Sequence, residues 1–164
     1  MIVVLGQEED GVKFTGLKAS KAACDLLGFR LVVDKKALND TRTGVALMKK
    51  AVAELRPRLA YMPSLDDSHP ARMEAFRVAK AATTEVPTVL SYETATTGLD
   101  YHPTHFVEVA YQMAMKSEAL EHFQAGTTQR PESTPEMAQA YARYWGRRER
   151  FALVEAFEVI QGDA

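Results

Sequence analysis

The sequence DDSHPAR, at residues 66–72, decides the predicted fold of this chain. It follows an apolar run at residues 59–63 that is typical of a strand, and it leads into a segment with helical spacing at residues 71–83. A polar loop between a strand and a helix lies at the carboxyl end of the strand, where open α/β sheets place their chemistry. We therefore expect functional residues in this loop.

The rest of the chain alternates between short apolar runs and amphipathic segments. The apolar runs predict strands at residues 2–5, 29–33, 59–62, 88–92, 106–109 and 154–160. Helical spacing predicts helices at residues 17–27, 43–55, 71–83, 110–123 and 135–147. The first helix ends before Gly28, a residue type that favours a helix C-terminus. This alternation predicts a single α/β domain over residues 1–164, with a Rossmann-like, doubly wound and mostly parallel sheet.

Composition narrows the class of protein. A chain of 164 residues with 46% hydrophobic content can bury one core, and a net charge of −2 gives no reason to expect a nucleic-acid partner. The single Cys24 excludes an intramolecular disulfide and lies at a predicted core position. No apolar stretch approaches the roughly 18 residues of a membrane span, and residues 1–5 are too short for a signal peptide. We therefore expect a cytoplasmic protein without a membrane partner.

Two further motifs accompany the loop, namely RYWG at residues 143–146 and VEAF at residues 154–157. Together with DDSHPAR they resemble the LmbE/PIG-L family of zinc-dependent N-acetyl-sugar deacetylases. In that family the loop reads Asp-x-His-Pro-Asp-His, and its last His binds the zinc. Here Arg72 stands in that last position. The resemblance covers most of the chain from Leu59 onward and implies a LmbE/PIG-L-like fold with a shortened N-terminal part.

The family also has a His-Pro-Asp-Asp motif after its first strand, and the resemblance allows two registers for it. In the first register, residues 2–5 are that strand, Gln7 replaces the ligand His, Glu9 falls on the general base and Asp10 on the acidic ligand. In the second, residues 2–5 are the family's second strand and the motif is absent. We favour the first, because a sheet tolerates the loss of an edge strand better than the loss of its central strand. In either register at most one family ligand, Asp10, is present.

The substitution at Arg72 opposes a metal centre. Arginine keeps its proton at any ordinary pH, so it places a fixed positive charge where the family holds a cation. A salt bridge between Arg72 and Asp10 would neutralise the carboxylate that the missing zinc leaves behind. The resemblance places His69 on the oxyanion side of the site. The candidate catalytic residues are Glu9, Asp10 and His69, and the candidate cleft residues are Gln7, Asp67 and Arg72.

Each candidate also has a plain structural interpretation, which we favour. His69 suits a turn before a helix, and residues 8–10 suit a solvated acidic turn. Asp66 and Asp67 suit caps for the free N–H groups at the start of a helix. His102 and His105 have a His-x-x-His spacing, but on an extended segment with a proline between them the two rings would point to different faces.

The sequence therefore predicts a LmbE/PIG-L-like domain that has lost its metal centre, has no cofactor and acts as a non-catalytic binding or structural subunit. A sugar-like small molecule is the expected ligand, and the resemblance implies self-association or a place in an assembly. The rival hypothesis is a zinc-dependent hydrolase that deacetylates an N-acetylglucosamine-like substrate at an altered site. A third hypothesis is that another polypeptide supplies a missing segment in trans.

Overall fold

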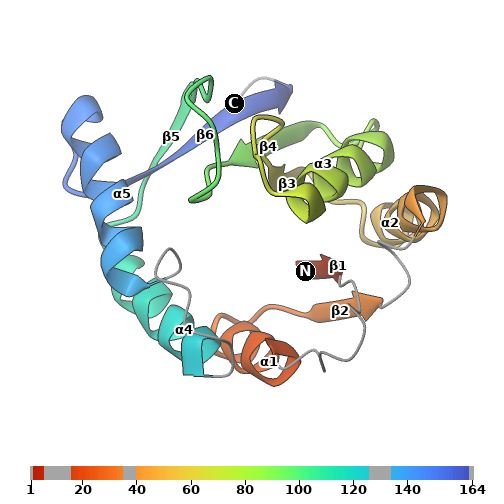
Figure 1. Ribbon diagram of the computed structural model, residues 1–164, viewed down its shortest axis with the longest axis horizontal. Helices are drawn as coiled ribbons and strands as arrows, with labels where there is room; N and C mark the ends of the chain where they lie inside the picture. The colour runs from red at the N-terminus through yellow and green to blue at the C-terminus, as the bar shows by residue number, and fades with distance from the viewer. Residues whose placement is uncertain (1, 6–15, 35–39, 126–133, 163–164) are drawn as a thin grey trace. The chain divides into compact units, whose positions relative to one another are not determined.

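The structure is a computed structural model, and it describes residues 2–5, 16–34, 40–125 and 134–162. The described part of the chain contains five helices (Figure 1), which are α1 (Gly16–Leu26), α2 (Thr41–Leu55), α3 (Pro70–Ala82), α4 (Met113–Ala125) and α5 (Pro135–Glu149). None of the described helices combines the length and the apolar character that a membrane span requires.

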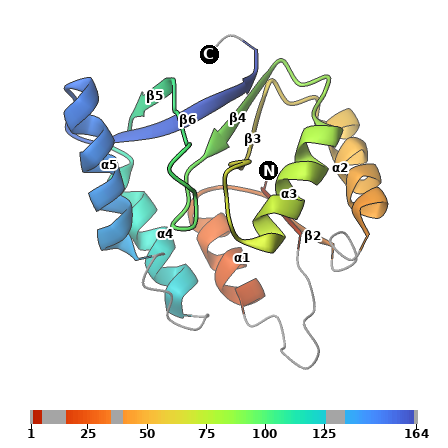
Figure 2. The ribbon, with the colours of Figure 1, turned by 45° about the horizontal axis from the view of Figure 1, so that its top comes forward.

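The strands form two sheets in the described residues. They are β1 (Ile2–Leu5), β2 (Leu31–Asp34), β3 (Leu59–Pro63), β4 (Thr88–Tyr92), β5 (His105–Glu108) and β6 (Val154–Gln161). The first two strands pair with each other, and the other four form a sheet in the order β3-β4-β6-β5 (Figure 2). Strand β3 runs parallel to β4, whereas β6 runs antiparallel to β4. The larger sheet is therefore mixed.

The contacts divide the chain into two compact units, which we describe separately. One unit contains α2, β3, α3, β4 and most of β6. Its helices α2 and α3 pack on each other, and α3 packs on β3 (Figure 1). The core residues are apolar side chains from α3, from the two parallel strands and from the turn between α3 and β4, namely Met62, Phe76, Ala79, Val86 and Val89. This core fixes the start of α3 beside the carboxyl ends of β3 and β4.

The other unit contains α1, α4 and α5, with α4 packed against both of the other helices. Val109, Met113 and Ala142 form its core cluster. The predicted core residue Cys24 is buried on α1. In α5, a Cβ atom at Gly146 would approach the carbonyl oxygens of residues 151 and 152 at 2.8 and 2.9 Å, so only glycine allows this turn to pack so closely.

The predicted elements are all present, and most boundaries agree within two residues. Gly28 adopts a positive φ of 68°, as its predicted place after the first helix requires. The expected mostly parallel sheet is only partly confirmed, because β6 is antiparallel to β4. A helical crossover that joins two neighbouring strands directly makes them parallel. Here β5, α4 and α5 lie between β4 and β6 in the sequence, so no direct crossover joins this pair. The single domain, the double winding and the N-terminal register remain predictions.

Candidate functional site

The predicted functional loop leaves β3 and enters α3 through a chain of local hydrogen bonds. The buried Ser64 hydroxyl accepts the backbone N–H of Asp66 at 3.1 Å. Asp67 then accepts the backbone N–H of His69 at 2.8 Å. Pro70 follows as the first helical residue, where its missing N–H costs no hydrogen bond. The N-cap residue of α3 is His69, whose side chain makes no capping hydrogen bond, and Asp67 binds the N–H of this residue rather than those of the first helical turn.

The Asp67 carboxylate forms the centre of a polar network with the loop that follows β4. Its side chain has no exposed surface. Oδ1 accepts the Thr96 hydroxyl at 2.6 Å in addition to the His69 N–H, and Oδ2 accepts the Thr94 hydroxyl. These contacts explain how a charged group can be buried here, because both oxygens have hydrogen-bond donors.

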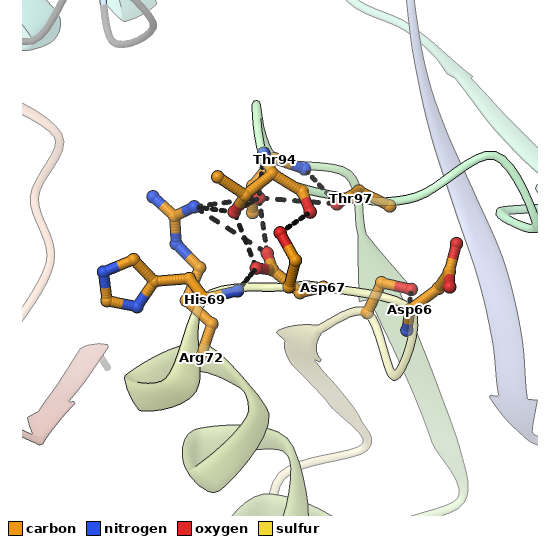
Figure 3. A network of polar contacts seen from close by, with 9 residues as sticks. Asp66, Asp67, His69, Arg72, Thr94 and Thr97 are labelled. Carbon is orange, nitrogen blue, oxygen red and sulfur yellow. Dashed lines mark hydrogen bonds and ion pairs between the residues drawn. The ribbon is translucent and has the colours of Figure 1, made fainter.

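Arg72 completes this network from the first turn of α3 (Figure 3). One of its terminal nitrogens, Nη1, donates to Thr94 Oγ1 at 3.0 Å and to Thr96 Oγ1 at 2.6 Å. The same nitrogen lies 3.8 Å from Asp67 Oδ2. Each hydroxyl therefore accepts from the guanidinium and donates to the carboxylate, so the two threonines carry the interaction between the opposite charges.

The network changes the acidity of Asp67. Burial is the largest influence and raises the pKa of this carboxyl, but the hydrogen bonds and the charge of Arg72 together outweigh it. The net result is a pKa below the ordinary aspartate value, so Asp67 is ionised at neutral pH. The site consequently holds a carboxylate and a guanidinium as a permanent charge pair.

His69 contributes its backbone to the network and not its ring. The side chain is exposed, and its imidazole extends away from Asp67 and the threonines (Figure 3). Among the described residues the ring has no hydrogen-bond partner. Gln7, Glu9 and Asp10 lie outside the described residues, so their roles and the salt bridge between Asp10 and Arg72 stay predictions. The structure brings together Asp67 and Arg72 from the candidate set, with His69 beside them.

A second carboxylate at the same edge of the sheet was missed by sequence reasoning. Glu158 on β6 accepts the hydroxyl of Ser91 at 2.9 Å, the hydroxyl of Ser64 at 3.3 Å and the backbone N–H of His102 at 2.8 Å. Tyr101 donates from its hydroxyl to the carbonyl of Ala156 at 2.8 Å and ties the same segment to β6. The available signal was polar residues at the ends of apolar strands, since Ser91 interrupts the run of β4.

Glu158 also faces an open cavity of about 470 Å³. The cavity is lined by apolar side chains, including Phe76, and by charged and polar ones, including Ser64, Asp66, Lys80, His102 and Glu158.

The two histidines with the His-x-x-His spacing lie in different surroundings. The His102 ring contacts the carbonyl of Asp100, whereas the His105 ring lies 6.3 Å from the ring of Phe157.

The described residues of the loop do not fit a zinc ion. Zinc requires neutral imidazoles or anionic side chains that converge with free lone pairs. Asp67 already accepts three hydrogen bonds, and the position of the family's last ligand holds the Arg72 guanidinium. Within the described ranges, no group of three His, Cys, Asp or Glu side chains could hold a metal ion.

The fold is that of a class of deacetylases. No protein-family model and no curated protein sequence matches the chain. Solved structures do match it over nearly its whole length, and several of them are deacetylases. The sequence identities of the five structures compared lie between 13% and 20%, so the likeness establishes the fold alone.

Three of these structures illustrate the match. The conserved protein TT1542 from Thermus thermophilus has a TM-score of 0.78 and 20% identity, over 99% of this chain and 81% of that chain. The N,N'-diacetylchitobiose deacetylase from Pyrococcus horikoshii has a TM-score of 0.63 and 13% identity, over 96% of this chain and 69% of that chain. The A40926 pseudoaglycone deacetylase Dbv21 has a TM-score of 0.63 and 15% identity, over 89% of this chain and 70% of that chain.

Proposed function

We propose that this chain is a LmbE/PIG-L-like domain without a zinc centre, which acts as a non-catalytic binding or structural subunit. The observation that carries this proposal is the permanent charge pair of Asp67 and Arg72. Threonine hydroxyls join the two groups, so the carboxylate already has the donors that it needs. A metal ion would have to displace a guanidinium that cannot lose its charge.

The wider parts of the proposal follow from the fold and from the sequence. The deacetylase fold supports a small-molecule cleft, and a sugar-like compound is the proposed ligand. Residues 1–164 form a single domain in this proposal, which works in the cytoplasm as a homo-oligomer or as a subunit of an assembly, without a cofactor and without a nucleic-acid or membrane partner.

The test is the metal content of the purified protein, after growth with added zinc and purification without a chelator. We expect far less than one zinc per chain, measured by elemental analysis. About one zinc per chain would overturn the proposal, because a mononuclear catalytic site holds one ion through protein side chains. His102→Ala is the control, since this variant would release an ion held loosely by an exposed histidine and would leave a zinc ion in the site bound.

One observation favours the rival hydrolase. The exposed His69 ring has no hydrogen-bond partner among the described residues and is free to meet a substrate (Figure 3). The rival predicts deacetylation of an N-acetylglucosamine-like compound that disappears in His69→Ala while the circular dichroism spectrum stays unchanged. Equal turnover in wild type and His69→Ala would exclude this role for His69.

A further inference from the structure

The Arg72 guanidinium is held by one nitrogen only. Both protons of Nη1 are donated to Thr94 Oγ1 and Thr96 Oγ1, at 3.0 and 2.6 Å. The other nitrogens, Nε and Nη2, have no hydrogen-bond partner among the described residues. The Arg72 side chain is 26% exposed, so solvent and small solutes reach it. The network therefore orients the guanidinium plane while leaving three N–H donors unused by the described residues.

The unused donors form the edge of arginine that recognises oxoanions. The Nε–H and Nη2–H bonds of a guanidinium point in nearly the same direction, and they match two oxygens that share one carbon or phosphorus atom. Figure 3 shows this edge turned away from Asp67, on the side to which the His69 ring also extends. An imidazole N–H there adds a further donor to the same solute.

The charges of the network favour this use of the edge. The carboxylate that compensates Arg72 lies near Nη1, at 3.8 Å, and not near the unused edge. Asp67 also receives hydrogen bonds from two hydroxyls and one backbone N–H, which spread its charge. In addition, the fixed guanidinium has already lost rotamer freedom, so binding a solute orders little more of the protein.

We propose that the Nε–Nη2 edge of Arg72, together with the His69 ring, binds the oxoanion group of a small molecule, a carboxylate or a phosphate. This inference rests on the proposed function, because a bound metal at this position would displace the guanidinium. Two sources share this chemistry: a carboxylate offers two coplanar oxygens, whereas a phosphate offers three around a tetrahedral centre. The two are separated by the choice of probe.

The test follows the arginine Nε–H signals of ¹⁵N-labelled protein by NMR, during titration with sodium phosphate and, separately, with sodium acetate at constant ionic strength. We expect a saturable shift of one signal, identified as that of Arg72 by its absence in Arg72→Lys. The better of the two anions identifies the oxoanion. His69→Ala should weaken the binding about five-fold, the effect of one hydrogen bond.

Arg77→Lys is the matched control on the same helix. Arg77 is 62% exposed, and its Nη1 pairs directly with the Glu74 carboxylate at 3.4 Å, so its guanidinium is more mobile than that of Arg72 and its substitution should leave the titration unchanged. Shifts that rise linearly without saturation, or that are equal for Arg72 and Arg77, would overturn the oxoanion site. Zinc analysis of the same sample separates the two failures: bound zinc overturns the proposed function, whereas no saturable shift in zinc-free protein overturns only this inference.

Discussion

The carboxylates of Asp67 and Glu158 lie at the same edge of the sheet and are stabilised in different ways. Asp67 has no exposed side-chain surface, and its donors include two hydroxyls that are themselves held by Arg72. Glu158 is half-buried, faces an open cavity, and accepts from two serine hydroxyls and a backbone N–H in the described part of the chain. The Asp67 carboxylate is fully buried and lies close to a guanidinium, whereas the Glu158 carboxylate lies beside a cavity and accepts from neutral donors.

The difference shows what each environment requires. A buried charge needs both an opposite charge and complete hydrogen bonding, and loss of either leaves a desolvated group. A carboxylate next to solvent depends less on an opposite charge and on protein hydrogen bonds, because water can donate a hydrogen bond where a protein donor is missing. The Asp67 network should therefore respond strongly to small chemical changes, and the Glu158 cluster should tolerate them.

The largest effect is expected for Asp67→Asn. The amide NH₂ group can take the place of either carboxylate oxygen. In the place of Oδ1 it faces the His69 N–H, and in the place of Oδ2 it faces the Thr94 hydroxyl and Arg72, so a donor faces a donor in both orientations. We expect a loss of about 2–3 kcal/mol in the free energy of unfolding, measured by urea denaturation at pH 7. A change below about 0.5 kcal/mol would mean that the charge pair does not stabilise the fold.

Removing the second carboxylate should cost less. Glu158→Ala leaves the hydroxyls of Ser64 and Ser91 and the His102 N–H without their acceptor. Because the site opens into the cavity, water can replace part of what is lost, and we expect a destabilisation of about 1–2 kcal/mol. The same urea titration measures it. A loss larger than that of Asp67→Asn would reverse the comparison between the two regions.

Arg72→Met tests the cation alone, and its effect depends on pH. The folded pKa of Asp67 is depressed, so its stabilisation is present above the unfolded pKa of about 3.9 and is lost as pH falls through the folded value. Without Arg72 one of the causes of the depression disappears, and the loss should begin at a higher pH. We expect about 1 kcal/mol less stability at pH 7, because the arginine is partly exposed.

Acid titrations of the wild type and Arg72→Met, followed by circular dichroism, check this shift. The control is Arg77→Met, which removes an exposed ion pair at 3.4 Å on the same helix. The expected result is an acid midpoint at higher pH for Arg72→Met alone. Identical midpoints in all three proteins would show that the charge of Arg72 does not act on Asp67.

Much of the fold was predictable from local pattern. Helical spacing and apolar runs located every element, because those periodicities follow from which face of each element is buried. The direction of β6 was not predictable, since periodicity says nothing of which strand a segment pairs with or in which direction. The DDSHPAR loop was recognised, with Arg72 as a fixed charge, but Asp67 binds the His69 N–H and two threonine hydroxyls rather than the first turn of α3.

The partners of these residues were not predicted, because they come from distant parts of the chain. Thr94 and Thr96 follow β4, and only the parallel pairing of β3 with β4 brings their loop beside Asp67. From the sequence, Asp10 is the expected partner of Arg72, but it lies outside the described ranges, and the structure places Asp67 at 3.8 Å from this arginine instead. Glu158 was missed for the same reason, since its partners lie on three separate segments.

The smallest effect is expected for Glu158→Gln. This variant is the most direct comparison with Asp67→Asn, because both replace a carboxylate by an amide. The amide oxygen can accept the His102 N–H, while the amide nitrogen faces Ser64 and Ser91, whose hydroxyls can rotate to accept. Glu158 forms no salt bridge within the described ranges, so we expect a change within about 0.5 kcal/mol in urea denaturation. The same change from carboxylate to amide is costly at Asp67, because the His69 N–H cannot become an acceptor and the Arg72 guanidinium loses its counter-ion. Equal losses in the two variants would mean that burial alone, and not the direction of the hydrogen bonds, separates the two regions.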